Sequence, residues 1–165
     1  MADEFSFDVV SKVDIQAIDD AVNAVNKEIS VRFDFRGSVS RAELDKVKAE
    51  ITVHSDDEGK LKSVIEIIKG RIAKRGVDQK AFDYQKVETA LGAKVRQLIK
   101  INQGINSEKA KLMVADIKKQ KFKVTPSIQS DQVRVTSKSK DSLQEVMNFL
   151  KKNDYEIPIQ FSNFR

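Results

Sequence analysis

Apolar positions along the chain follow two periods, one typical of amphipathic helices and the other typical of strands. Spacing of i, i+3, i+4 and i+7 predicts helices around Ile18–Val25, Leu61–Ile68, Ala110–Ile117 and Leu143–Leu150. Alternation of apolar and polar residues predicts strands at 5–10, 32–36, 51–55, 81–85, 95–101, 122–128, 133–137 and 157–161. Each half of the chain is therefore predicted to run strand, helix, strand, strand, helix, strand.

An internal repeat supports this division. With a shift of 82 residues, Ile51–Ile68 aligns without a gap with Val133–Leu150. The preceding parts match at a shift of 92 residues, which indicates a longer hairpin connection in the first half, at about 37–46. Two βαββαβ units predict an α+β protein made of two ferredoxin-like modules, residues 1–92 and 93–165.

Each predicted module is a four-stranded antiparallel sheet with two helices on one face. The second and fourth strands are then the sheet edges, where proline is tolerated. Pro126 falls in the second strand of the second module and Pro158 in its fourth, so both prolines agree with the predicted topology.

Charge is divided unevenly along the 165 residues. Residues 1–93 carry 15 Lys and Arg against 18 Asp and Glu, whereas residues 94–165 carry 15 against 7, a net charge of +8. A basic half of this kind indicates contact with phosphate. A lysine-rich solvated surface is the alternative explanation.

The open face of the second predicted sheet is the candidate binding surface. Its side chains are mostly cations, hydroxyls and amides, which can bind phosphates and base edges. We assign to a nucleotide site on this module Arg96, Lys100, Lys123, Arg134, Thr136 and Lys138. The alternative is a face that is solvated or covered by the other module.

The phenylalanines do not indicate a base-stacking platform. The segment Arg32–Gly37 looks like the aromatic strand of an RNA-recognition sheet, but Phe33 and Phe35 follow the apolar alternation and are expected to face the helices. The chain has no Trp, and its tyrosines are Tyr84 and Tyr155 alone.

The sequence lacks the residues that several classes of chemistry require. Without cysteine, and with His54 as the one histidine, the chain is predicted to bind no metal and no cofactor. Neither common phosphate-binding glycine motif is present, and Ser137–Lys140 resembles a polar turn, so we expect no enzyme activity. No long apolar run and no secretory signal are evident, which predicts a cytoplasmic protein with no membrane partner.

Several segments, in order along essentially the whole chain, resemble the YajQ family. They are Phe7-Asp-Val-Val-Ser-Lys-Val-Asp14, Arg32-Phe-Asp-Phe-Arg-Gly37, Gln103-Gly-Ile105, Arg134-Val-Thr136, Asp141-Ser-Leu-Gln144 and Gln160-Phe-Ser-Asn-Phe-Arg165. The resemblance implies a small bacterial cytosolic nucleotide-binding protein with tandem ferredoxin-like (RNP-like) domains. Members of that family are linked to RNA or to cyclic di-GMP.

The resemblance also implies that the two modules exchange their first strands. Residues 5–10 would then complete the second sheet and residues 95–101 the first. Arg96 and Lys100 would join Arg32 and Arg36, which we add to the predicted nucleotide site, and the basic site would straddle both modules.

Three functions are alternatives at this point. The first is a non-catalytic nucleotide-binding protein that senses cyclic di-GMP or another purine nucleotide such as GTP. The second is an RNA-binding protein for tRNA or another structured RNA, whose affinity would fall steeply with salt. The third is a protein-interaction module with an unknown partner.

Overall fold

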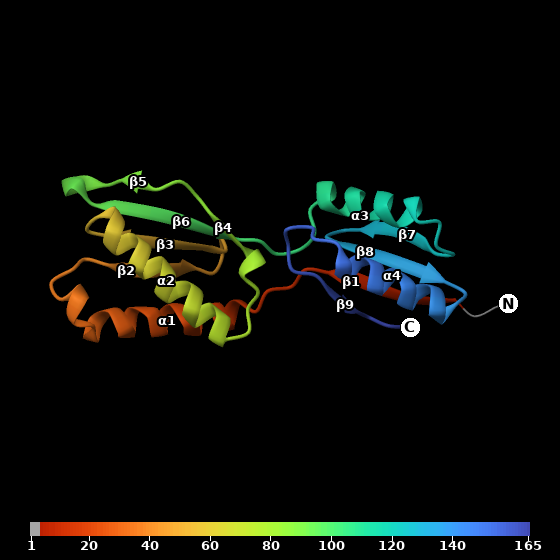
Figure 1. Ribbon diagram of the computed structural model, residues 1–165, viewed down its shortest axis with the longest axis horizontal. Coiled ribbons are helices and arrows are strands. Elements are labelled where there is room, and N and C mark those ends of the chain that lie inside the picture. The colour runs from red at the N-terminus through yellow and green to blue at the C-terminus, as the bar shows by residue number, and fades with distance from the viewer. Residues whose placement is uncertain (1–3) are drawn as a thin grey trace. The chain divides into compact units, whose positions relative to one another are not determined.

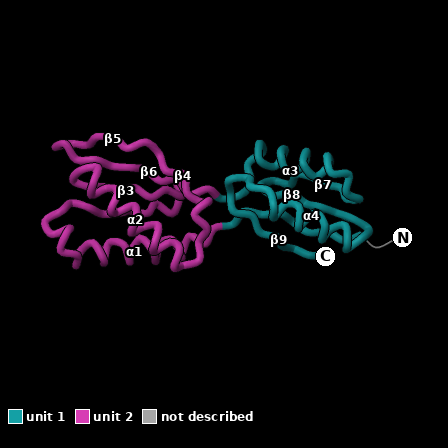
Figure 2. Tube along the Cα trace, in the orientation of Figure 1, with its two compact units in different colours: residues 1–12, 103–165 teal, residues 13–102 magenta. Residues whose placement is uncertain are grey.

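The structure is a computed structural model that describes residues 4–165; residues 1–3, part of the N-terminal stretch in which no secretory signal was evident, lie outside the described residues. The chain divides into two compact units (Figure 2). Unit 1 contains the chain up to Lys12 together with Gln103–Arg165, and unit 2 is Val13–Asn102. The division thus falls after Lys12 and after Asn102, and not between residues 92 and 93, because the first strand of each repeat pairs within the sheet of the other.

Unit 1 is an antiparallel sheet with two helices packed on one face (Figure 1). Its elements are β1 (Phe5–Val10), α3 (Ser107–Lys119), β7 (Thr125–Gln129), β8 (Gln132–Ser137), α4 (Lys140–Lys152) and β9 (Gln160–Ser162). The strand order is β7-β8-β1-β9, so the N-terminal strand is central. Phe7 lies opposite Val135, and Val9 lies between Val133 and Phe161.

Unit 2 has the same arrangement. Its elements are α1 (Ile15–Val31), η1 (Phe33–Phe35), β2 (Arg41–Asp45), β3 (Glu50–Ser55), α2 (Glu58–Lys74), η2 (Gln79–Ala81), β4 (Phe82–Tyr84), β5 (Glu88–Thr89), η3 (Leu91–Ala93) and β6 (Val95–Ile101). The strand order is β2-β3-β6-β4, and β5 pairs with the beginning of β6. The structure confirms the α+β class with two ferredoxin-like modules, and it shows the exchange of first strands that the family resemblance implied.

Each unit has its own apolar core between sheet and helices. In unit 1, Phe7 and Val9 are fully buried against residues of α3 and α4 such as Met113 and Leu150. In unit 2, Ile99 of β6 is fully buried in a cluster with residues of α1, α2 and β3. The exchanged strands therefore supply core residues to the units that they join, and burial of this apolar surface is the main force that holds them there.

The predicted strand at 32–36 is wrong. This segment is a 3₁₀ turn, in which Phe35 N–H donates to Arg32 O and Arg36 N–H donates to Phe33 O. The Arg32 side chain stabilises the turn by bonding Asp34, at 2.9 and 3.0 Å. The second strand of the unit, β2, lies instead inside the stretch 37–46 that the sequence predicted as a connection.

The edges of unit 1 differ in smaller ways from the prediction. β7 begins at Thr125, after Phe122 and Val124, which pack against the core outside the strand. Pro126 does lie in an edge strand, as predicted. Pro158 precedes β9, which is shorter than the predicted strand at 157–161. Within residues 4–165, no helix has both the length and the apolar character needed to span a membrane.

Candidate functional site

The loop between η1 and β2 is anchored by a chain of polar contacts. Ser38 Oγ donates to the Asp56 carboxylate and lies 2.7 Å from Ser40 Oγ, which in turn lies 2.8 Å from Ser55 Oγ at the end of β3. Val39 N–H also donates to Asp56, at 3.3 Å. The hydrogen bond from Ser38 holds the pKa of Asp56 below its ordinary value, so this carboxylate is ionised and keeps the loop beside β3.

The edge strand β2 is fixed by Asn26 of α1. The Asn26 Nδ2 donates to Ala42 O at 2.8 Å, and Ala42 N–H donates to Asn26 Oδ1 at 2.9 Å. These two bonds satisfy backbone groups that an edge strand otherwise leaves unpaired. They also fix the position of the neighbouring residue, Arg41.

A basic row crosses one end of the unit 2 sheet. Arg41 of β2 lies opposite His54 of β3, which lies opposite Arg96 of β6. Their neighbours Ala42, Val53 and Val95 are buried in the core. Because side chains alternate along a strand, the basic row lies on the face away from the helices.

A hollow of about 630 Å³ opens at this row, and we call it the Arg41 hollow. Four of its lining residues are basic, namely Arg41, His54, Lys94 and Arg96. The remainder of the lining is Val39, Ser55, Thr89, Ala90, Leu91 and Val95. The strands β2, β3 and β6, together with the segment from β5 to β6, thus bring cationic groups into one concavity.

The ion pairs that the arginines of the Arg41 hollow make within residues 4–165 are exposed. Arg41 Nε donates to Glu43 at 2.8 Å, and Arg96 Nε donates to Glu88 at 3.0 Å. Both arginine side chains are about half exposed, at 50% and 52%. Since exposed pairs contribute little free energy, an anion can compete for these guanidinium groups.

The imidazole of His54 reports the electrostatic environment of the hollow. Burial lowers the pKa of His54 below its ordinary value of 6.5, and the positive charges of Arg41 and Arg96 lower it further, against the opposing effect of Glu43. A bound anion would reverse this effect and favour the protonated ring. The row is therefore suited to hold a phosphate.

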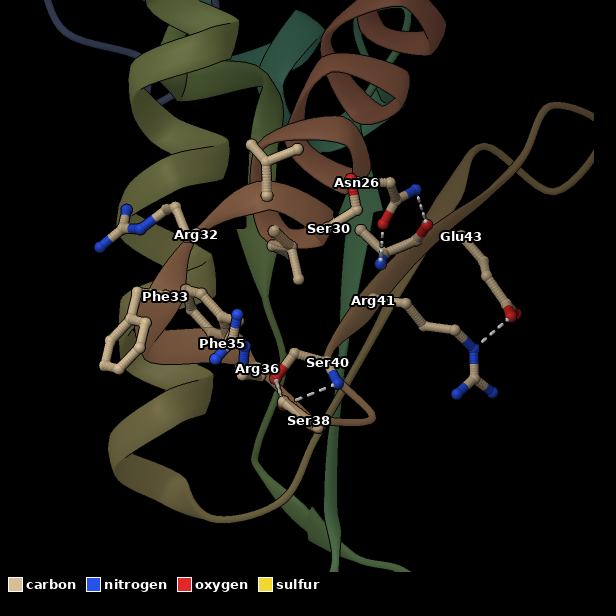
Figure 3. Close-up of a pocket in the computed structure, with 14 residues that line it drawn as sticks. Asn26, Ser30, Arg32, Phe33, Phe35, Arg36, Ser38, Ser40, Arg41 and Glu43 are labelled. Carbon is tan, nitrogen blue, oxygen red and sulfur yellow. Dashed lines mark hydrogen bonds and ion pairs between the residues drawn. The ribbon is translucent and has the colours of Figure 1, made fainter.

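A second hollow, of about 680 Å³, shares the lining residue Arg41 with the first; we call it the Phe33 hollow (Figure 3). Arg41 lines both hollows, and its side chain extends from β2 together with that of Glu43, away from Phe33 (Figure 3). Phe33, predicted to be buried, is 82% exposed, whereas Phe35 is buried as expected. The guanidinium carbon of Arg36 lies 5.4 Å from the centroid of the Phe33 ring.

The structure gathers three of the predicted site residues at this end of unit 2. Arg32 and Arg36 line the Phe33 hollow, and Arg96 lines the Arg41 hollow. Arg32 is already bound to two carboxylates, those of Glu28 and Asp34, so its role includes holding the turn. Lys100 lies toward the other end of β6, opposite Glu50, and lines neither hollow.

The other four predicted residues belong to unit 1. Lys123 and Lys138 are exposed, and Thr136 Oγ1 donates to a backbone carbonyl of β7 at 3.3 Å. Arg134 Nε donates at 2.9 Å to Asp8, a buried carboxylate of β1. Whether these four residues contact a nucleotide stays a prediction.

Sequence reasoning missed Arg41, His54 and Lys94 as site residues. Arg41 falls inside the stretch predicted as a connection, so no strand partner could be given to it. Lys94 lies just before the strand predicted at 95–101, outside every predicted helix and strand. The signal available was a basic residue at one end of each of three strands that are neighbours in the sheet, and Arg96 joins this row because the first strands are exchanged.

Known proteins match this chain over essentially its full length. A family model described as nucleotide-binding protein YajQ-like matches residues 5–165. A nucleotide-binding protein from Desulforamulus reducens is 48% identical over 165 residues, spanning 100% of this chain and 99% of its own length. One from Magnetococcus marinus is 50% identical over 160 residues (97% and 98%), and one from Chloroherpeton thalassium is 44% identical over 165 residues (100% of both). The resemblance seen in short segments thus holds from β1 to the C-terminus, and the chain belongs to the YajQ-like family.

Proposed function

We propose that this chain is a non-catalytic nucleotide-binding protein whose Arg41 hollow holds the phosphates of the nucleotide. The observation that carries the proposal is the cross-strand row of Arg41, His54 and Arg96, joined by Lys94 in one concavity. The names of the relatives, nucleotide-binding proteins along their full length, support the same class of ligand.

The chemistry of the row matches a phosphate group. Arginine presents several N–H donors in a planar fork that bonds phosphate oxygens in pairs, and lysine adds a point charge. In Arg41 and Arg96 the ion pairs with Glu43 and Glu88 are made through Nε, and the terminal nitrogens of both side chains make no hydrogen bond within residues 4–165. A phosphate can therefore bind at the outer edges of both forks without first breaking a buried pair.

The size of the site favours a small ligand. Pockets for nucleotides and other small molecules have volumes of roughly 300–1,000 Å³, and the Arg41 hollow falls within that range at about 630 Å³. Cyclic di-GMP, which the family resemblance implies, and GTP are the first ligands to test.

The alternative function is binding of RNA. Exposed lysines on α3 and just after it, Lys111, Lys118, Lys119 and Lys121, favour it because they form a surface of point charges in unit 1. Such contacts would give an affinity that falls steeply with salt and that changes little when any one cation is removed.

Isothermal titration calorimetry with GTP, cyclic di-GMP and ATP tests the proposal. We expect at least one nucleotide to bind the wild-type chain, and Arg41→Ala and Arg96→Ala each to weaken that binding by about tenfold or more, as loss of charge-assisted hydrogen bonds does. Arg75→Ala is the matched control, since Arg75 is also a half-exposed arginine of unit 2 paired with one carboxylate, that of Asp20, and lies outside both hollows. Equal losses in all three variants, or no binding by the wild type, would contradict the proposal.

A further inference from the structure

We infer that the Phe33 hollow is the base subsite of the nucleotide site, where a purine stacks on the Phe33 ring and pairs with the Arg36 guanidinium. This inference rests on the proposed function, because it assumes that phosphates occupy the adjoining Arg41 hollow. It assigns a binding site to the base of the nucleotide, which the phosphate site does not contact.

The exposed ring of Phe33 is the first observation. Its alternation with Phe35 predicts a buried position, yet the turn η1 places the ring almost entirely in solvent. A ring in this position keeps a large apolar surface in contact with water, and a stacked base would cover that surface. Base stacking on an aromatic side chain is the common use of such an exposed ring in nucleic-acid recognition.

The turn that carries Phe33 is held in place before any ligand arrives. Arg32 bonds both oxygens of Asp34 and also Glu28, at 3.1 Å. Glu28 in turn accepts from Arg71 of α2, at 2.8 and 3.2 Å. This network ties η1 to both helices of unit 2, so the ring is pre-positioned and little conformational entropy is lost on binding.

Arg36 is the second observation. Its guanidinium lies 5.4 Å from the Phe33 ring, and it forms no ion pair within residues 4–165. The guanidinium lies over one face of the ring, and no carboxylate of the described part of the chain holds it there, so a base that stacks on this face takes its place. The freed guanidinium fork then matches the O6 and N7 acceptors at the edge of guanine. Adenine presents a donor in place of O6, so guanine is the purine that this subsite favours.

The two hollows are neighbours within unit 2. Arg41 lines both, and the Ser38–Ser40 segment that precedes it forms part of the wall of the Phe33 hollow (Figure 3). The Phe33 hollow lies on the α1 side of the edge strand β2 and the Arg41 hollow on the face away from the helices, so a nucleotide with its phosphates at Arg41 reaches this cavity of about 680 Å³ by crossing the edge of β2.

A single tryptophan at position 33 gives a direct readout, because the natural chain contains none. We expect the emission of Phe33→Trp to be quenched by GTP and to be unaffected by tripolyphosphate, which carries the same phosphates without a base. Phe164→Trp in unit 1 is the control, since Phe164 is also an exposed phenylalanine, and its emission should not respond to GTP.

Affinities of further variants test the stack itself. Phe33→Leu keeps an apolar side chain without a ring and should weaken GTP binding by about 5- to 150-fold, whereas Phe33→Tyr should retain it. Neither change should alter tripolyphosphate binding, and Arg36→Ala should reduce the preference for GTP over ATP.

The outcomes separate this inference from the proposed function. If Phe33→Leu binds GTP like the wild type while Arg41→Ala weakens it, the base subsite is wrong and the phosphate site stands. If neither GTP nor tripolyphosphate binds the wild-type chain, both are wrong.

Discussion

The substitution Phe7→Ala near the N-terminus is predicted to destabilise the sheet formed by the C-terminal part of the chain. Phe7 lies on β1, the strand between β8 and β9 in unit 1. Its ring is fully buried and packs edge-on against Phe161 with centroids 5.5 Å apart. If β1 instead completed the sheet of its own half of the chain, the damage would appear in unit 2.

The magnitude follows from the burial. Replacing a buried phenylalanine with alanine costs about 3–5 kcal/mol, including the cavity that is left. In a unit of roughly 60–100 residues each kcal/mol lowers the melting temperature by about 4–8 °C. Unit 1 of the variant should therefore melt at least about 10 °C below that of the wild type.

Hydrogen exchange followed by mass spectrometry can assign the effect to one unit. Peptides from β8, α4 and β9 should lose protection in Phe7→Ala, and peptides from Ile15–Ile101 should keep it. Phe33→Ala is the matched control, because it makes the same chemical change at an exposed ring and should leave the stability of both units unchanged. Loss of protection within Ile15–Ile101 and not in unit 1 would refute the strand exchange.

Three further predictions follow from individual contacts. Hydrogen bonding from Arg134 holds the pKa of Asp8 below its ordinary value, although burial opposes this shift. The ionised carboxylate therefore stabilises unit 1 above about pH 4, and this stabilisation is lost as the pH falls towards the lower pKa of the folded state. The melting temperature of Asp8→Asn should depend less on pH in this range than that of the wild type. His54 gives the one histidine ring signal in proton NMR, and its titration midpoint should lie below 6.5 and rise when GTP or inorganic phosphate is added, whereas an unmoved midpoint would place the anion elsewhere. Asn26→Ala removes both hydrogen bonds to Ala42 and should lower the free energy of unfolding of unit 2 by about 1–3 kcal/mol in urea titrations, while Asn23→Ala on the exposed side of α1 should not.

Much of the fold could be predicted from the sequence because periodicity reports which side of an element is buried. The first strand of the second repeat, for example, was expected at 95–101, and β6 is Val95–Ile101. The exchange of strands could not be predicted in this way, since Phe7 and Val9 alternate identically whichever sheet they join. Only the family resemblance implied it.

The site was harder to predict because it depends on local contacts. The alternation of Phe33 and Phe35 favours a strand, but the Arg32–Asp34 ion pair stabilises a turn, and the ring of Phe33 points into solvent as a result. The second strand lies instead at Arg41–Asp45, with Arg41 opposite His54, a pairing that no spacing in the sequence shows.

The most direct test of the central claim is to map the nucleotide on the full chain by amide chemical shifts, with GTP and cyclic di-GMP titrated at physiological salt. The largest shifts should occur at residues 36–41, 54–55 and 89–96, around the two hollows of unit 2. Shifts concentrated at residues 123–138 of unit 1 would contradict it, and so would the absence of any saturable shift.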